Sequence, residues 1–181
     1  MDLSDGLVTS ISTFPESDNV VPSWSHDGQW IYFASNQGGK TFHVWKVPLT
    51  GGAPVQVSQG SGFAALESFN GKYVYYAKLS EPGIWRVPRD GGTETSLLAE
   101  HGPDNWGNWA VGTDAIYFIT SERGDKSRIL RLDVRTRRLS QISMLQRPAF
   151  YGLTISADAK SIIYSQRDRD EHDVVITRLL P

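Results

Sequence analysis

The segment "PSWSHDGQWIYFAS" (Pro22–Ser35) decides the fold, because it recurs along the chain in altered form. Its echoes are "AALESFNGKYVYYAK" (Ala64–Lys78), "WGNWAVGTDAIYFITS" (Trp106–Ser121) and "YGLTISADAKSIIYSQ" (Tyr151–Gln166). Each copy separates two runs of strand-forming residues by a short turn sequence, such as Asp-Gly in the first copy and Asn-Gly in the second. Asp-Gly and Asn-Gly tolerate the positive φ angles of short hairpin turns, so each copy predicts a β-hairpin.

Further strand-like blocks follow each of the first three hairpins. The second block is "HVWKVPLTGG" (His43–Gly52), "GIWRVPRDGG" (Gly83–Gly92) and "RILRLDVRTR" (Arg128–Arg137), and the third is "PVQVS" (Pro54–Ser58), "TSLLA" (Thr95–Ala99) and "LSQIS" (Leu139–Ser143). Matching Tyr32, Tyr75, Tyr117 and Tyr164 gives spacings of 43, 42 and 47 residues. Four short strands in every repeat of about 40–45 residues predict an all-β fold, a β-propeller of about four blades with four antiparallel strands each.

The first residues, "LSDGLVTSIS" (Leu3–Ser12), match the turn and outer strand of a blade, because "LVTSIS" aligns with Arg138–Ser143. The last residues, "DVVITRLL" (Asp173–Leu180), match a third strand. We therefore expect strand 7–12 to complete the last blade, since a closed ring leaves only short, protected edges. The predicted organisation is a single propeller domain over residues 1–181, with blades at 14–59, 60–100, 101–145 and 146–181.

The blade sequences "PSWSHDGQWIYFAS" and "IWRVPRDGG" resemble the TolB-type WD-like propeller repeat. In bacteria this repeat occurs in TolB, in CadC-like regulators and in the propellers of prolyl-oligopeptidase-type peptidases. Blades three and four depart from it, because Gly112-Thr113-Asp114 and Asp158-Ala159 replace the Asp-Gly turn. Members usually have six or seven blades. The resemblance therefore leaves open a small closed ring, part of a larger propeller, or one ring shared by two chains.

Composition excludes several classes of function. A formal net charge of −2 argues against a phosphate-binding nucleic-acid surface, and there is no apolar run of the ~18 residues that a membrane span needs. Without cysteine, the chain has no disulfide, thiolate metal site or cysteine nucleophile. No secretory signal is encoded, which predicts a cytoplasmic protein, or a periplasmic one if the chain belongs to a longer parent.

The loops that join one blade to the next should gather at one mouth of the channel and hold the candidate ligand site. The predicted ligand-binding residues are His101, Asn105, Trp106, Trp109, Phe150 and Tyr151. Aromatic and polar side chains that converge at such a mouth suit a protein partner or a small ligand. The alternative is that these loop residues simply pack between blades.

Ser25-His26-Asp27 has the residue types of a catalytic triad, but the three are consecutive in a predicted tight turn. Triad members meet in space from separate parts of a chain, so the structural reading is preferred. No other motif assigns a catalytic residue.

The preferred function is a non-enzymatic interaction module without a cofactor, a sensor or scaffold that recognises a protein or small ligand through its loops. The alternative is a calcium-dependent hydrolase, such as a lactonase, in which a metal polarises the ester and activates water. Its predicted ligands are Glu16, Asp18, Glu67 and Asp104, with Asn105 as a further candidate. The chain is expected as a monomer, or as a dimer that exchanges residues 7–12.

Overall fold

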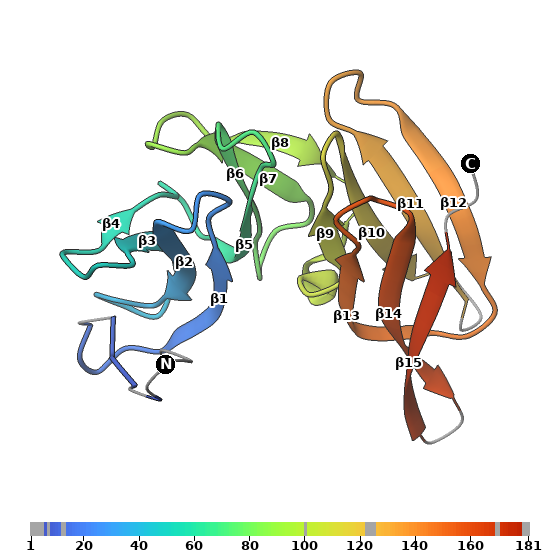
Figure 1. Cartoon of the computed structure of the whole chain (residues 1–181), viewed down its shortest axis with the longest axis horizontal. Helices are drawn as coiled ribbons and strands as arrows, with labels where there is room; N and C mark the ends of the chain where they lie inside the picture. The colour runs from blue at the N-terminus through green and yellow to red at the C-terminus, as the bar shows by residue number, and fades with distance from the viewer. Residues whose placement is uncertain are drawn as a thin grey trace.

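The structure is a computed structural model of the 181-residue chain. It describes Gly6 and residues 8–11, 14–99, 101–121, 126–168 and 171–178. Four antiparallel sheets follow one another along an open arc, with blade one at one end and blade four at the other (Figure 1). This arrangement confirms the predicted all-β propeller fold.

The strands run outward from the centre of the arc in chain order. Blade one holds β1 (Asn19–Trp24), β2 (Trp30–Ser35), β3 (His43–Pro48) and β4 (Val55–Gln56). Blade two holds β5 (Phe63–Glu67), β6 (Tyr73–Ala77), β7 (Ile84–Pro88) and β8 (Thr95–Leu98). A 3₁₀ turn, η1 (Pro103–Asn105), leads into blade three, with β9 (Trp109–Val111), β10 (Ala115–Ser121), β11 (Ser127–Asp133) and β12 (Leu139–Leu145). Blade four holds β13 (Ala149–Ile155), β14 (Ser161–Asp168) and β15 (Glu171–Arg178).

The predicted closure of blade four by the N-terminal strand is wrong for the described residues. The fourth sheet has three strands, and residues 8–11 form no strand. Instead, Ile11 and Phe14 pack against a buried cluster in blade one. Ile11 and Phe14 therefore lie beside blade one, at the opposite end of the arc from β15 (Figure 1). Burying two apolar side chains on the nearest open sheet face replaces the predicted pairing. Residues 7 and 12 lie outside the described part of the chain.

The turn after the first strand has the same hydrogen-bond pattern in three of the blades. In blade one, the Ser25 hydroxyl donates to Asp27 Oδ1 (2.6 Å) and accepts from the Trp30 backbone N–H (2.9 Å). The same pattern recurs with Ser68 and Asn70 in blade two and with Ser156 and Asp158 in blade four. Ser25-His26-Asp27 is therefore a structural turn, as the preferred reading held.

These serines also correct the predicted alignment of blade four. Counting eight residues from the turn serine of each blade gives Phe33, Tyr76 and Tyr164. Tyr164 packs with Ile162 against blade three, whereas Tyr32 packs against blade two. Tyr164 thus corresponds to Phe33 and not to Tyr32. Because successive strand residues point to opposite faces, this single-residue difference exchanges the two faces of the sheet.

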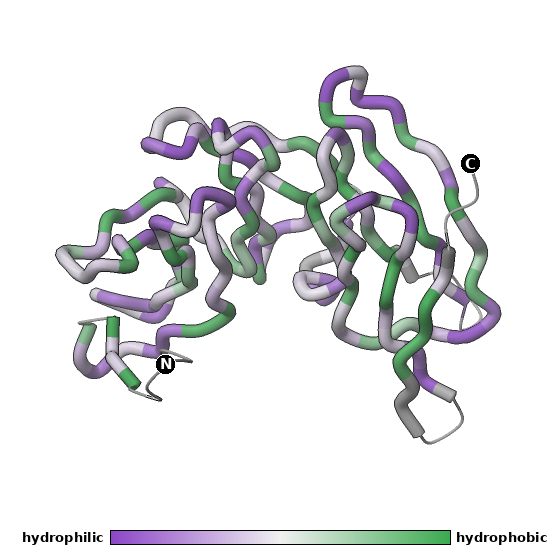
Figure 2. Tube along the Cα trace, in the orientation of Figure 1, coloured by the Kyte–Doolittle hydropathy of each residue, from purple (hydrophilic) through white to green (hydrophobic). Residues whose placement is uncertain are grey.

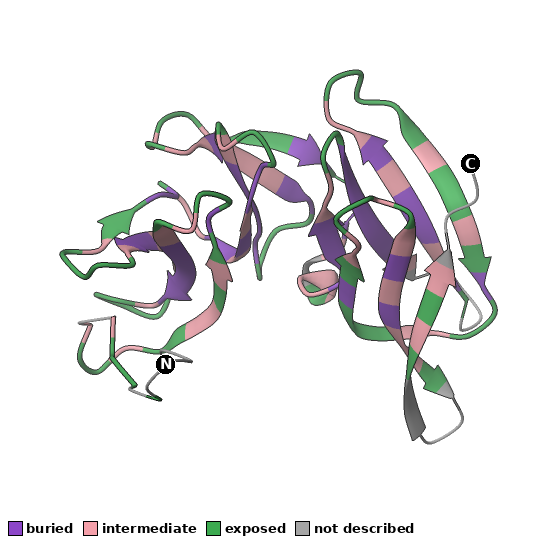
Figure 3. Ribbon diagram, viewed as in Figure 1, coloured by how far each residue is buried: buried purple, intermediate pink, exposed green. Residues whose placement is uncertain are grey.

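The core lies between blades. Each sheet has a leading face toward the preceding blade and a trailing face toward the next. Apolar side chains from the trailing face of one blade and the leading face of the next form three buried clusters, between blades one and two, two and three, and three and four. Figure 3 shows buried residues concentrated in the central strands, whereas β12 and the described part of β15, at the periphery, are mostly intermediate or exposed.

Candidate functional site

One side of the arc gathers the loops that link blades. Because neighbouring strands are antiparallel, the connections between blades share this side with the loops that join second to third strands. We call it the loop face. The opposite side carries the turns after first and third strands, including Ser25–Asp27, and we call it the turn face.

Five aromatic side chains form a continuous row across the loop face, from blade one to blade four. Neighbouring ring centroids lie 5.2 Å apart for Phe42 and Phe63, 5.1 Å for Phe63 and Trp106, 5.1 Å for Trp106 and Tyr151, and 5.3 Å for Tyr151 and Phe150. Trp106 and Tyr151 stack at 27°, and the other pairs are edge-to-face. Both geometries are favourable for aromatic rings. We call this set the aromatic row.

The end of the row in blade four is the most accessible part of it. Phe150 is 45% and Tyr151 is 43% exposed, whereas Phe63 is buried and Phe42 and Trp106 are partly buried. Exposed aromatic rings attached to a buried base are typical of binding surfaces, because the row is ordered before a partner arrives.

The blade-three segment that carries Trp106 is fixed by hydrogen bonds. Trp109 Nε1–H donates to the Trp106 carbonyl (2.8 Å). The Gly152 N–H lies 3.2 Å from both the Gly107 carbonyl and Asn108 Oδ1, which ties blade four to the same segment. A side chain at Gly107 would press on the Tyr151 ring, since an added Cβ would lie 3.3 Å from Cδ1. Glycine at this position therefore permits the stacking.

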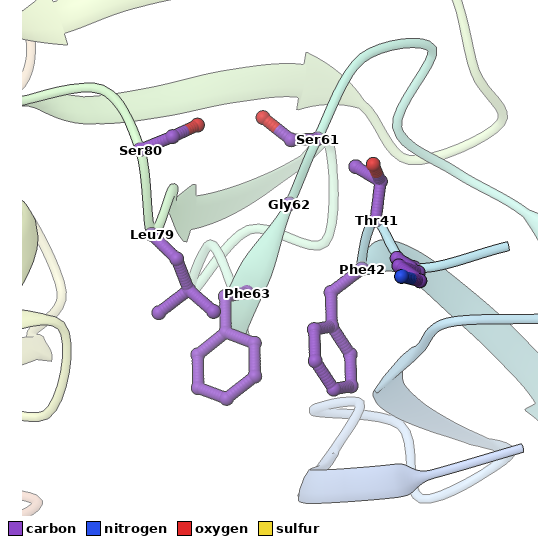
Figure 4. Close-up of a pocket in the computed structure, with 8 residues that line it drawn as sticks. Thr41, Phe42, Ser61, Gly62, Phe63, Leu79 and Ser80 are labelled. Atoms are coloured by element: carbon purple, nitrogen blue, oxygen red, sulfur yellow. The ribbon is translucent and has the colours of Figure 1, made fainter.

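A hollow of about 200 Å³ opens beside Phe42 and Phe63 (Figure 4). The rings of Phe42 and Phe63 and the aliphatic side chain of Leu79 form its apolar wall, and the hydroxyl groups of Ser61 and Ser80 point toward each other (Figure 4). A second hollow, of about 250 Å³, lies against Trp106, between the inner strands of blades one to three. The aromatic row therefore borders two hollows that side chains of a ligand could enter.

The predicted ligand residues divide between this surface and the interior. Trp106, Phe150 and Tyr151 belong to the row, and Trp109 is buried beneath it. Asn105 is half-buried in η1, where its side-chain oxygen accepts from Asn108 at 3.4 Å. Sequence reasoning missed Phe42 and Phe63. The connection that contains Phe63 was among the mouth loops, so its aromatic residue was the available signal.

His101 lies in the interior and is unsuited to direct ligand binding at this surface. Its imidazole is buried edge-to-face against Phe118, with centroids 5.7 Å apart. Burial lowers its pKa to about 4, because the charged form would lose its hydration. Neither ring nitrogen has a well-formed hydrogen bond within the described residues, although the nearby Asn105 backbone opposes part of the effect of burial on the pKa.

The predicted calcium ligands are not brought together. No group of three or more His, Asp and Glu side chains that could hold a metal is found within the described ranges. Glu16, Asp18 and Asp104 are exposed, and Asp18 exchanges hydrogen bonds with Asn36. The calcium site therefore stays a prediction without a matching cluster.

Glu67 is committed to a contact between blades one and two. Its carboxylate accepts from the Tyr32 hydroxyl (2.7 Å) and the His26 backbone N–H (2.7 Å), and Arg89 Nε lies 3.3 Å away. Arg89 also pairs with Asp27 at 2.8 Å. Hydrogen bonds from Ser25, the Gln29 backbone and Arg89 lower the pKa of Asp27, and burial with the Glu67 contact raises the pKa of Tyr32. This network holds the turn face together.

Comparison with known proteins places the chain by fold. No protein-family profile matches it. The uncharacterized protein Atu1656 of Agrobacterium fabrum (strain C58) is 26% identical over 136 residues, which cover 66% of this chain and 45% of that protein. The chain thus spans less than half the length of this curated relative.

Solved structures give a clearer answer. TolB from Acinetobacter baumannii matches with a TM-score of 0.79 and 19% identity, over 98% of this chain and 45% of TolB. A putative TolB from Agrobacterium tumefaciens matches with a TM-score of 0.72 and 15% identity, over 90% of this chain and 58% of that one. The predicted TolB-type propeller fold is therefore confirmed.

Other similar structures have differing roles. Oligogalacturonate lyase in complex with manganese matches with a TM-score of 0.64 and 15% identity, over 84% of this chain and 48% of the lyase. A chain of the nidogen/laminin complex matches with a TM-score of 0.68 and 13% identity, over 92% of this chain and 64% of that one. The fold alone does not choose between enzyme and interaction module. Within the described residues, no helix is long and apolar enough to cross a membrane.

Proposed function

We propose that this chain is a non-catalytic interaction module that binds an extended protein segment along the aromatic row. The observation that carries the proposal is the unbroken series of ring contacts from Phe42 to Phe150, which crosses all four blades and ends in exposed rings.

The arrangement suits recognition of a peptide. The four ring-to-ring steps span at most about 20 Å, the reach of about six residues of extended chain. Aromatic side chains supply large contact areas with few rotatable bonds, so little conformational entropy is lost when they bind. The two hollows beside the row would accept apolar side chains of the segment, with the hydroxyls of Ser61 and Ser80 as hydrogen-bonding partners.

The comparisons support a protein partner in a limited way. One similar chain comes from a complex of two proteins, nidogen and laminin. A metal-dependent hydrolase would need a cluster of metal-binding side chains, and the described residues contain no group of three or more His, Asp and Glu that could hold a metal. The proposed binding role relies instead on the aromatic row and on the two hollows beside it.

Selection from a phage-displayed library of random peptides on the immobilised full chain tests this function. Enriched peptides are then synthesised and titrated by calorimetry against wild type, Tyr151→Ala and Phe69→Ala. Phe69 is a matched control, because it is similarly exposed (52%) but lies on the turn face against His26. We expect Tyr151→Ala to weaken binding at least tenfold, about 1.4 kcal/mol, as for a hot-spot residue.

Phe69→Ala should change the affinity by less than twofold, and a chelator should leave it unchanged. A library without enriched peptides, or peptides that bind Tyr151→Ala as tightly as wild type, would exclude the aromatic row as a peptide site. Binding abolished by the chelator would return the calcium alternative to consideration.

A further inference from the structure

The trailing face of a blade is covered wherever another blade follows. Val44, Ile84 and Ile129 occupy the same position on the third strands of blades one to three, and each is 0% exposed. The register of blade four places Val174 at this position, opposite Ser165. Val174 is 77% exposed. A side chain that is core in three blades is thus open to solvent in the fourth.

A second position on this face is more apolar than its counterparts in the other blades. Ile176 stands where the other blades have Lys46, Arg86 and Arg131. It is 65% exposed and lies opposite Ile163. Figure 2 shows β14 and β15 with many hydrophobic residues, and a hollow of about 260 Å³ lies on this face beside Ile163 and Val174. Ile163, Val174 and Ile176 therefore form an apolar patch on the face that is covered in the three preceding blades.

Blade one carries the complementary half at the other end of the arc. Its leading face presents Ile31, Phe33, Trp45 and Val47, the positions that in blades two and three cover the preceding blade. In the described residues, this face is covered by Ile11 and Phe14, whose ring lies 4.7 Å from Trp45. Trp45 Nε1 is buried there without a hydrogen-bond partner in the described part of the chain.

The two halves lie at opposite ends of the open arc and do not meet within one chain (Figure 1). We propose that the trailing face of blade four binds the leading face of blade one in a second copy of this chain. The contact continues the packing of the three internal blade interfaces. The side chains of Ile11 and Phe14 act as a cap that the incoming blade displaces. This surface is separate from the aromatic row, so it stands independently of the proposed function.

Light scattering of the full chain over a wide concentration range tests the contact. We expect the mass of the wild type to rise to multiples of one chain, and Val174→Asp to weaken the association at least tenfold. Val55→Asp is the matched control, since Val55 is half-exposed on β4, away from both faces. It should change the association by less than twofold. A wild type that stays at the mass of one chain, or an assembly that Val174→Asp leaves intact, would overturn the proposal.

Phe14→Ala tests the cap separately. Removal of the ring uncovers Phe33 and Trp45, so we expect tighter association at the same protein concentration, with a circular dichroism spectrum like that of the wild type. An equal or weaker association of a folded Phe14→Ala chain would show that Phe14 does not compete with a second copy.

Discussion

The buried imidazole of His101 makes stability depend on pH. Its pKa is lowered to about 4 by burial, whereas histidine in an unfolded chain has a pKa of about 6.5. Between these values the unfolded chain binds more protons, so the free energy of unfolding falls as pH is lowered from about 6.5 to about 4. We expect this histidine to account for a loss of about 2 kcal/mol between pH 7 and pH 4.5, measured by urea unfolding at these two pH values.

His101→Phe should remove most of this dependence. At pH 7 its stability should equal or exceed that of the wild type, because the substitution deletes two buried nitrogens that lack hydrogen bonds and keeps an aromatic ring against Phe118. His26→Phe is the control and should retain the pH dependence, since His26 is exposed. An unchanged slope in His101→Phe would assign the effect to other groups.

Individual residues also show where sequence reasoning about the site succeeds. Trp106, Phe150 and Tyr151 were predictable because they lie in loops that the repeat places at one mouth. His101 lies in one of these loops and Glu67 lies at the opposite, turn-face end of β5, and the burial of both depends on contacts with other parts of the fold. Glu67, for example, accepts hydrogen bonds from blade one, 35 and 41 residues earlier in the chain. The sequence pattern of a single blade does not predict such contacts between blades.

The loop between β6 and β7 depends on one glycine. Gly83 has φ of +111°, its N–H donates to the His101 carbonyl, and an added Cβ would overlap the Leu98 carbonyl oxygen. Gly83→Ala should therefore destabilise the chain by about 2–4 kcal/mol in urea unfolding, from backbone strain and overlap together. Gly38→Ala is matched, because its φ is +79° and nothing lies within 4 Å of its Cβ. It should cost only about 1 kcal/mol. If the two variants lost the same free energy of unfolding, the overlap with the Leu98 carbonyl oxygen would contribute nothing to the effect at Gly83.

The strands themselves were largely readable from sequence. Turn residues and alternating apolar runs recur in each blade, and hydrogen bonds within a blade are local along the chain. The alignment of blade four failed by one residue because tyrosine occupies either face of a blade, and only the turn serine fixes the register. The N-terminal strand failed for a different reason. Its sequence suits an outer strand, but pairing with β15 requires a closed ring, and ring closure is a property of the whole arc.

An open arc leaves its blades unequally supported. In repeat architectures each unit is stabilised by its neighbours, so blades two and three gain two blade interfaces, whereas blade four gains one. The face of blade four that bears Val174 and Ile176 is exposed. Its strands should therefore open more readily than those of blades two and three in an isolated chain.

Hydrogen exchange followed by mass spectrometry measures this difference and its link to assembly. In the Val174→Asp chain, which should stay apart, we expect peptides from β14 to exchange faster than peptides from β6, the equivalent central strand of blade two. In the wild type, protection of β14 should increase with protein concentration while that of β6 stays constant, because association covers the trailing face of blade four. Equal protection of β14 and β6 in Val174→Asp would mean that blade four needs no neighbour. Protection of β14 that ignores concentration in the wild type would mean that no second copy supplies one.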